Sequence, residues 1–220
     1  MYKRQGAKSF AKLIINKILR IAKNAKIIEI EKNDIEIRVI PIRENYNPWE
    51  AMSFPKMSLV DLVHEDWNGE EEDESVFRRE INKTFIFIPI VKKKVSVFNK
   101  QKNKNESKFE NYKNWKFLKC VKWQPSLENL NGIQIEWEKC KTQILENNVK
   151  TWPEKQKNRT IQRNNLLKSS ESQFIHIRPH TTDSSHIDVP YQKYTNGRIE
   201  ICWQSFWFNK SFLQNIIKVD

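Results

Sequence analysis

The chain has 220 residues, of which 38% are hydrophobic and 11% aromatic, so it is long and apolar enough to bury one continuous core. Its four glycines leave almost no material for glycine-rich phosphate loops, and its three scattered cysteines form neither a CxxC pair nor a disulfide framework. No apolar run approaches the roughly 20 residues of a membrane span, and no secretory signal opens the chain. We therefore expect a cytoplasmic protein that does not enter a membrane.

The net charge is the first indication of function. Thirty-nine Lys and Arg residues against 27 Asp and Glu residues give a formal charge of +12 and an isoelectric point near 9.5. Such a balance attracts polyanions, and nucleic acid above all. The chain is also rich in Lys, Asn and Ile, which AT-rich genomes favour, so the charge alone leaves nucleic-acid binding and composition bias as alternatives.

The first predicted elements are a helix and two strands. Apolar residues recur at helical spacing over 7–23 and predict an amphipathic helix there. Ile27–Glu31 and Asp34–Ile42 are predicted strands, and the second alternates strictly between apolar and other residues up to Ile40.

The middle of the chain begins with a short predicted helix after Ser58, whose hydroxyl is expected to cap it. The acidic run Glu70–Glu74 is a predicted solvated loop. The apolar stretch 84–91 has the composition of a buried strand. The lysine-rich segment 92–110 is predicted to be a basic hairpin or loop insertion.

The C-terminal half combines further strands with a long helix. Residues 115–123 have β character, Ser126 is expected to cap a helix over 126–147, and 151–170 is a predicted polar, basic loop. The remaining predicted elements are strands at 173–178 and 198–203 and a closing helix at 209–219. This order predicts an α/β (α+β) fold with a mixed β-sheet flanked by helices.

Charged residues alternate along the predicted strand Asp34–Ile42. Because residues i, i+2 and i+4 of a strand share a face, Asp34, Glu36 and Arg38 should form one row opposite an apolar row. Such a row is most often the solvated side of an ordinary strand. Alternatively, neighbouring carboxylates bind a divalent cation for phosphodiester hydrolysis, and a cationic side chain stabilises the developing charge.

A second candidate site begins where the strand 173–178 ends at Pro179. The following polar loop opens with Arg178 and His180, and an arginine there can contact guanine O6 and N7 while hydroxyls bind phosphates. His176 and His180 lack a third ligand at the spacing of a zinc site. The aromatic cluster 206–212, taken alone, is typical of a core.

Six stretches in one order along the chain together resemble a known family. They are Glu36–Ile42, Glu50–Phe54, Phe85–Ile90, Trp123–Pro125, Ile177–His180 and Phe206–Lys210. The set resembles the MutH-type family, which joins the methyl-directed mismatch-repair nuclease MutH to type II restriction endonucleases that cut at GATC. The resemblance covers about residues 6–218. Around Glu50–Phe54, Glu65–Trp67 and Phe206–Lys210 it is strongest to the C-terminal half of two-domain GATC enzymes, which binds DNA without catalytic residues.

The resemblance implies one restriction-endonuclease-like domain over 1–220 with Mg²⁺-dependent cleavage of DNA. Glu36 matches a metal-binding carboxylate, and Glu29 or Asp34 would be the further metal ligand. Arg38 stands at the position of the catalytic lysine, and Lys83 lies near a second lysine position. Arginine keeps the positive charge of lysine but not its compact ammonium group.

The resemblance also implies DNA-contacting residues. The matching positions are Glu50, Phe54, Arg178, Pro179, His180, Trp207 and Lys210. Glu50 would accept a hydrogen bond from adenine N6, Phe54 lies near an aromatic wedge in the DNA, and Arg178 would contact a base. His180 replaces a lysine of the same loop, and Trp207 and Lys210 would face the groove or a phosphate.

The sequence therefore predicts a MutH-like domain of a type II restriction enzyme that binds double-stranded DNA at GATC, with a degenerate active site. One alternative is a catalytically inactive effector domain that assists an upstream catalytic domain or a second copy. The other is a basic nucleic-acid-binding protein without sequence preference. Because a helix begins within a few residues of the start, we also expect the chain to be a partial gene product.

Overall fold

The computed structural model is of the mixed α/β class, as predicted. It describes residues 15–17, 20, 34–70, 73–99, 101–156, 159–180, 192–194, 197–199 and 201–218. Residues 15–17 are helical, whereas the rest of the predicted helix 7–23 apart from residue 20, the predicted strand 27–31 and Glu29 lie outside the described residues. Among the helices in the described ranges, none is both long and apolar enough to cross a bilayer.

The chain divides into two compact units built from interleaved segments. Unit 1 takes the chain up to Glu50, the segment Lys83–Gln124 and the chain from Gln214 onward. Unit 2 takes Ala51–Asn82 and Pro125–Leu213. Each unit therefore depends on segments that are distant in the sequence.

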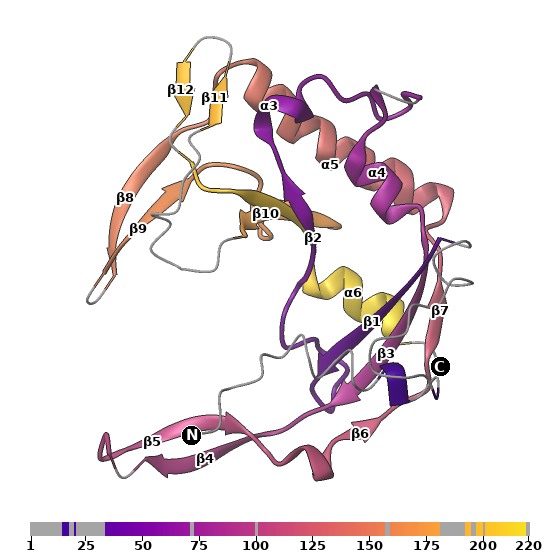
Figure 1. The fold of residues 1–220 in the computed structure, drawn as a ribbon, viewed down its shortest axis with the longest axis vertical. Helices are drawn as coiled ribbons and strands as arrows, with labels where there is room; N and C mark the ends of the chain where they lie inside the picture. The colour runs from indigo at the N-terminus through magenta and orange to yellow at the C-terminus, as the bar shows by residue number, and fades with distance from the viewer. Residues whose placement is uncertain are drawn as a thin grey trace. The chain divides into compact units, whose positions relative to one another are not determined.

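Unit 1 is built on a four-stranded sheet (Figure 1). Strand β1 (Ile35–Ile42) runs parallel to β3 (Thr84–Val91) in unbroken register. The predicted strand over 115–123 is divided into β6 (Lys116–Phe117) and β7 (Val121–Trp123), which both pair antiparallel with β3. A short 3-10 helix, η2 (Tyr112–Asn114), precedes β6.

Apolar side chains cover both faces of this sheet, as expected for paired parallel strands. On one face the buried Ile88 and Ile90 pack with Ile37, Val39 and other partly buried residues. On the other face the rings of Phe85 and Phe87 lie 5.5 Å apart, both fully buried, and each contacts Trp123. Few polar side chains can therefore lie on either face of β1 without a partner.

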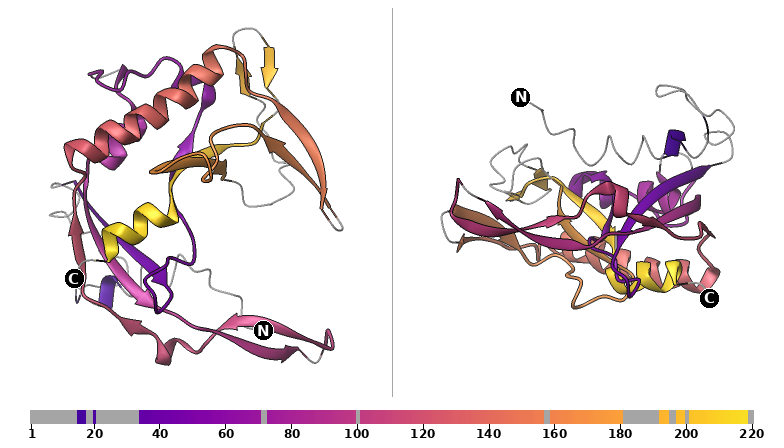
Figure 2. Two further views of the ribbon diagram at one scale, coloured as in Figure 1. Left: turned by 180° about the vertical axis from the view of Figure 1, so that it is seen from behind. Right: turned by 90° about the horizontal axis from the view of Figure 1, so that it is seen from below.

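The predicted basic segment 92–110 contains an antiparallel hairpin. Its strands are β4 (Lys94–Asn99) and β5 (Lys104–Phe109), which pair over their whole length. Figure 2 shows this hairpin as a narrow ribbon of two strands. In the described residues its strands pair with no other strand.

Unit 2 joins three helices to a three-stranded antiparallel sheet and two hairpins. The helices are α3 (Leu59–Leu62), α4 (Val76–Ile81) and α5 (Leu127–Leu145), and the sheet has the order β10 (Ile175–Pro179), β13 (Gln204–Phe208), β2 (Met52–Met57). The hairpins pair β8 (Thr151–Gln156) with β9 (Arg159–Asn164) and β11 (Gln192–Tyr194) with β12 (Gly197–Ile199). Helix α6 (Lys210–Ile217) begins in unit 2 and ends in unit 1.

Both predicted caps are confirmed. The Ser58 hydroxyl accepts a hydrogen bond from the Asp61 N–H at 3.2 Å at the start of α3. At the start of α5 the Ser126 hydroxyl accepts from the Asn129 N–H at 3.1 Å, and the Asn129 side chain accepts from the Ser126 N–H at 3.3 Å. This reciprocal pair satisfies two backbone donors that the first turn leaves open.

Other predictions fail where polar side chains hide regular structure. The predicted loop 151–170 contains the hairpin β8–β9, whose strands are tied by two hydrogen bonds from the Arg163 guanidinium to the Glu154 carboxylate, at 2.8 and 3.1 Å. The predicted strand 198–203 is confirmed only at 198–199, because β12 ends at Ile199 and residues 201–203 precede β13. Helix α4 was not predicted, since the acidic run before it suggested only a loop.

Candidate nucleic-acid interface

One face of the sheet β10–β13–β2 carries cations and no carboxylate. The register places Arg178 beside Ser205, and Ser205 beside Lys56. Directly opposed residues of antiparallel strands share a face, so Arg178 and Lys56 flank Ser205 in one row. The next row on this face consists of His176, Trp207 and Ser53. None of the three strands contains Asp or Glu; we call this surface the cationic face.

Arg178 and His180 gather around Trp207 on the cationic face. The Arg178 guanidinium is exposed and lies 5.0 Å from the centre of the Trp207 ring. Such a cation–π contact orients a guanidinium without cancelling its charge. The His180 ring lies 5.9 Å from the Trp207 ring, and its Nδ1 is 2.5 Å from the hydroxyl oxygen of the buried Ser205. The face therefore combines a free charge with ordered side chains.

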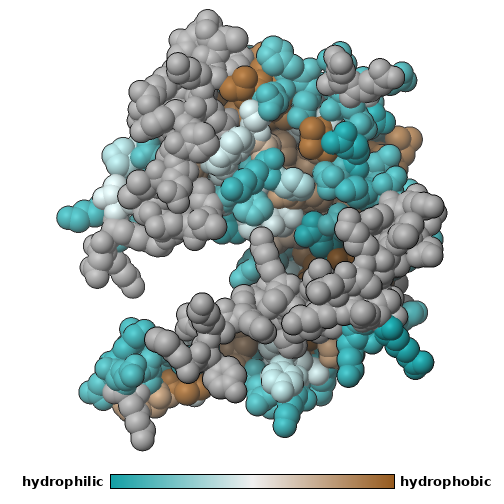
Figure 3. All heavy atoms as spheres, viewed as in Figure 1, coloured by the Kyte–Doolittle hydropathy of each residue, from teal (hydrophilic) through white to brown (hydrophobic). Residues whose placement is uncertain are grey.

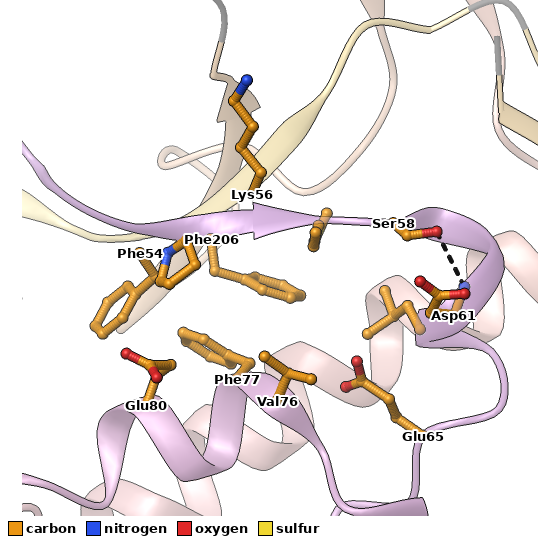
Figure 4. A pocket seen from close by; sticks show the side chains of 12 residues that line it. Phe54, Lys56, Ser58, Asp61, Glu65, Val76, Phe77, Glu80 and Phe206 are labelled. Carbon is orange, nitrogen blue, oxygen red and sulfur yellow. Dashed lines mark hydrogen bonds between the residues drawn. The ribbon is translucent and has the colours of Figure 1, made fainter. Parts of the chain in front are cut away.

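Lys56 and Phe54 point to opposite sides of β2 (Figure 4). Phe54 lines a cavity of about 120 Å³ together with Phe77 and Phe206. Three carboxylates also line that cavity, those of Asp61, Glu65 and Glu80. Lys56 is also at the edge of this cavity, but its exposed side chain extends away from the three carboxylates (Figure 4).

His176 connects the cationic face to a buried polar network. His176 is 5% exposed, and its Nδ1 donates a hydrogen bond to the Asn209 side-chain oxygen at 2.6 Å. Asn209 in turn donates from its amide nitrogen to the Ser172 carbonyl at 2.9 Å. Burial, helped by the nearby Arg178 charge, lowers the pKa of His176 to about 4, although the hydrogen bond with Asn209 opposes this shift. His176 is therefore neutral at pH 7 and adds no charge to the face.

A buried carboxylate of α5 holds the beginning of β10. The Glu136 carboxylate accepts hydrogen bonds from three consecutive backbone N–H groups, those of Gln173, Phe174 and Ile175, and the shortest two are 2.6 and 2.8 Å. Glu136 is 7% exposed. Charged acceptors make hydrogen bonds about twice as strong as neutral ones, so this contact anchors the strand that carries Arg178.

Close packing at Gly132 completes this anchor. A Cβ atom at Gly132 would lie 2.3 Å from the Phe174 ring, a distance that real Cβ atoms do not adopt. Only glycine therefore lets the ring approach the helix backbone at this point. Phe174 also packs edge-on against Phe212 of α6 at 5.0 Å.

The predicted metal site on β1 is internally neutralised. The Arg38 Nη2 atom lies 2.5 Å from the Glu36 Oε1 atom, and the two side chains are 31% and 24% exposed. Register places Glu36 beside Phe85 and Arg38 beside Phe87, so the pair shares its face with two fully buried rings. The row is thus half-covered and not fully solvated, because side chains on both faces of β1 are half-buried.

The ion pair is not fully satisfied by the described residues. Glu36 Oε2 and Arg38 Nε are buried, and neither has a hydrogen-bond partner in this part of the chain. Asp34 does not continue the row, because it lies in a turn before β1 with a φ of 49°. This left-handed conformation ends the strand alternation that placed Asp34 beside Glu36.

The described residues of β1 do not fit a Mg²⁺ ion. Mg²⁺ requires carboxylate oxygens that are free to coordinate it, whereas Glu36 is already paired with a guanidinium whose charge repels a cation. No group of three or more His, Cys, Asp or Glu gathers as a metal site within the described ranges. Lys83 lies in the bend directly before β3, just as Asp34 lies directly before the neighbouring β1. Lys83 is therefore not beside Glu36, whose neighbour on β3 is Phe85.

The remaining predicted DNA contacts divide between the units. Glu50 is exposed at the end of a unit 1 segment, and Lys210 is exposed at the start of α6. Phe54 corrects a prediction: it is 2% exposed and packs edge-on against Phe77 and Phe208, at 5.0 and 4.8 Å. A ring held in the core of unit 2 does not form a wedge in DNA, since the apolar alternation of β2 turns it inward.

Two residues of the site, Lys56 and Glu136, were not predicted from the sequence. Lys56 was overlooked because a register shift in the β2–β13 pairing turns it to the face opposite Phe54. Glu136 occupies the apolar stripe of α5 with Ile133, Trp137 and Cys140, and an acidic residue in such a stripe indicates a buried anchor.

The fold defines a mixed α/β protein of two compact units, with a cationic sheet face whose three strands contain no Asp or Glu. A particular family is not shown: neither a scan against protein-family models nor a search of curated proteins finds a match.

Proposed function

We propose that this chain binds duplex DNA through the cationic face, as a MutH-like domain whose expected recognition sequence is GATC. The single observation that carries the proposal is the row Arg178–Ser205–Lys56, in which two exposed cations lie on strands that contain no Asp or Glu. A net charge of +12 supports it through long-range attraction to the phosphate backbone. The choice of GATC rests on the sequence resemblance.

Each residue of the cationic face has a distinct task in this proposal. Arg178 donates two hydrogen bonds to guanine O6 and N7, a geometry that suits its planar guanidinium. Lys56 contacts a phosphate, which adds affinity but no sequence information. Trp207 holds the guanidinium over its ring, so less conformational freedom is lost on binding.

Competition between a GATC duplex and a scrambled duplex in a gel shift tests the proposal. Replacing Arg178 by Ala should reduce discrimination by about 1–3 kcal/mol, because one bidentate base contact is lost. The matched control is Arg163→Ala, since Arg163 is neutralised by Glu154 on a hairpin of the same unit. Equal binding of both duplexes by the unchanged protein would refute sequence recognition and leave the non-specific alternative.

Cleavage of the bound DNA is the second candidate function. It is favoured by the spacing of Glu36 and Arg38, which resembles the metal-binding glutamate and catalytic lysine of the family. The direct pairing of the two side chains favours the inactive alternative, an effector that acts beside an upstream catalytic domain or a second copy. We therefore rank binding above cleavage.

Nicking of a GATC plasmid with Mg²⁺ separates these two functions. A well-placed catalytic group contributes about two to four orders of magnitude in rate, so Arg38→Lys should raise nicking by that factor if this unit cleaves. Absence of nicking by both proteins would remove the enzyme candidate and leave the binding proposal intact.

A further inference from the structure

The β4–β5 hairpin of unit 1 is an unpaired basic ribbon. Between Lys94 and Phe109 the sequence has five lysines and one glutamate, a net charge of +4. Its large apolar side chains are unusually exposed, with Phe98 at 55% and Val95 at 41%. Figure 3 shows brown hydrophobic residues directly beside teal hydrophilic ones at the lower left, where Figure 1 places this ribbon. A hairpin of this kind is only marginally stable alone, and exposed apolar side chains often mark an interaction surface.

The two faces of the ribbon have the same net charge, but only one of them holds a carboxylate. Register pairs Ser96 with Ser107 and Phe98 with Asn105 on one face, which also holds Lys94 and contains no carboxylate. We call this the hydroxyl face. The other face consists of Val95, Val97, Asn99, Lys104, Glu106 and Lys108.

The only carboxylate of the ribbon is neutralised on the other face. Asn99 donates a hydrogen bond to Glu106, and Lys102 and Lys108 lie 3.0 and 3.4 Å from its oxygens. These contacts lower the pKa of Glu106 to about 2, first through Asn99 and then through the lysines. Glu106 therefore repels a polyanion only weakly. The ribbon has more lysines than this one carboxylate can neutralise, so positive charge remains available to bind a polyanion.

The base of the ribbon is fixed to unit 1 by aromatic and cationic contacts. Phe109 packs edge-on against Trp49 at 5.3 Å, and the Trp49 indole N–H donates to the Ile42 and Lys92 carbonyls at 3.1 and 3.0 Å. The Lys94 ammonium lies 4.8 Å from the Trp49 ring. The hydroxyl face therefore begins on a rigid support. There the Lys94 ammonium is held by an aromatic ring and not by a carboxylate of the described residues.

We propose that the β4–β5 ribbon lies in the major groove of duplex DNA with its hydroxyl face toward the base edges. This inference rests on the proposed binding of duplex DNA and adds a second contact surface, on unit 1. Charge complementarity selects a polyanion, since the ribbon carries +4 and its hydroxyl face has no carboxylate. A two-stranded ribbon fits the major groove, and strands of six residues span about 20 Å.

The groove contacts differ in kind from those of the cationic face. Serine hydroxyls bond to any base, so Ser96 and Ser107 add affinity with little sequence preference. Lysines at the ribbon edges contact phosphates and make binding dependent on salt. Sequence discrimination thus stays with Arg178, which makes the two surfaces separable by experiment.

Two variants of equal charge test the ribbon. Ser96→Glu places a carboxylate on the hydroxyl face, and Val95→Glu places one on the next residue of the other face, opposite Lys108. Because both positions are exposed, both variants should fold, which circular dichroism checks. Ser96→Glu should weaken binding of GATC and scrambled duplexes alike by about tenfold or more, and Val95→Glu by about threefold at most.

Crosslinking gives a second readout that does not depend on altered charge. A photoreactive benzoylphenylalanine at position 98 should crosslink to duplex DNA, and the same group at position 97 should do so much less. Equal effects of the two glutamates, equal crosslinking at both positions, or a stronger effect on single strands than on duplex would overturn the ribbon proposal alone. Absence of duplex binding by the unchanged protein would overturn both this proposal and the proposed function.

Discussion

Two strands of this protein share the pattern Ile-x-Ile-Arg and differ in what stands at x. In β1 the variable residue is Glu36, and Arg38 pairs with it at 2.5 Å. In β10 it is His176, which is neutral and bonded to Asn209, so Arg178 lies on the Trp207 ring and keeps its charge. The residue two positions earlier thus decides whether the arginine forms an ion pair within its own strand or remains available to a ligand.

The largest expected effect concerns the support of β10. Glu136→Ala removes the acceptor of three backbone N–H groups and should lower the free energy of unfolding by about 3–4 kcal/mol. Urea unfolding measures the change. The control is Glu138→Ala, because Glu138 is exposed on the same helix and should cost less than about 0.5 kcal/mol. Equal costs for both variants would show that the anchor does not stabilise the Arg178 strand.

The next effect tests the neutral state of His176. Its folded pKa of about 4 lies below the value of 6.5 for an exposed histidine, so the unfolded chain binds a proton first as the pH falls. Stability should be unaffected above pH 7 and should fall by about 2 kcal/mol between pH 7.5 and pH 5. Urea unfolding across this range checks the slope, and His176→Gln should remove that part of it. A slope unchanged in the variant would assign it to other groups.

A smaller effect tests the ion pair on β1. Glu36→Leu leaves a partly buried guanidinium unpaired and should cost about 1–2 kcal/mol, discounted from the value for fully buried pairs because both groups are partly exposed. The double variant Glu36→Leu, Arg38→Leu should cost less than this single change, since apolar side chains suit the face beside Phe85 and Phe87. Additive costs would mean that the pair contributes nothing as a pair.

The smallest effect concerns the ring beneath Arg178. Trp207→Leu should weaken duplex binding by about two- to fivefold, corresponding to the roughly 0.5–1 kcal/mol of an exposed cation–π contact. In an Arg178→Ala background the same change should have no further effect. A full additional loss there would show that Trp207 contacts DNA by itself.

The sequence predicted local elements well where one signal dominated. Ser58 and Ser126 cap their helices as expected, and the apolar run 84–91 is a strand, because caps and continuous apolar runs depend on neighbouring residues alone. The hairpin β8–β9 escaped prediction because only Ile161 among its described side chains is buried, so no apolar alternation marks it. Of the predicted helix 7–23, residues 15–17 are helical.

The candidate site was predicted only in part. Arg178, Pro179, His180 and Trp207 were expected in a DNA-contacting set, and the structure gathers Arg178, His180 and Trp207 on one sheet face. Lys56 and the role of Glu136 were not foreseen, since they depend on a register shift and on hydrogen bonds to residues about 37 positions away. The expected function, double-stranded DNA binding at GATC, remains a proposal.

By itself the sequence determined the positive charge, the alternation of β1 and β10, and the presence of an arginine at the end of each Ile-x-Ile-Arg pattern. Only the tertiary structure decided how far each arginine is open to a ligand. Strand alternation fixes the face on which a side chain lies, but not which side chains of other strands and helices lie beside it. Those neighbours, Phe85 and Phe87 beside the Glu36–Arg38 pair and Trp207 beside Arg178, set how far each guanidinium is open to a polyanion.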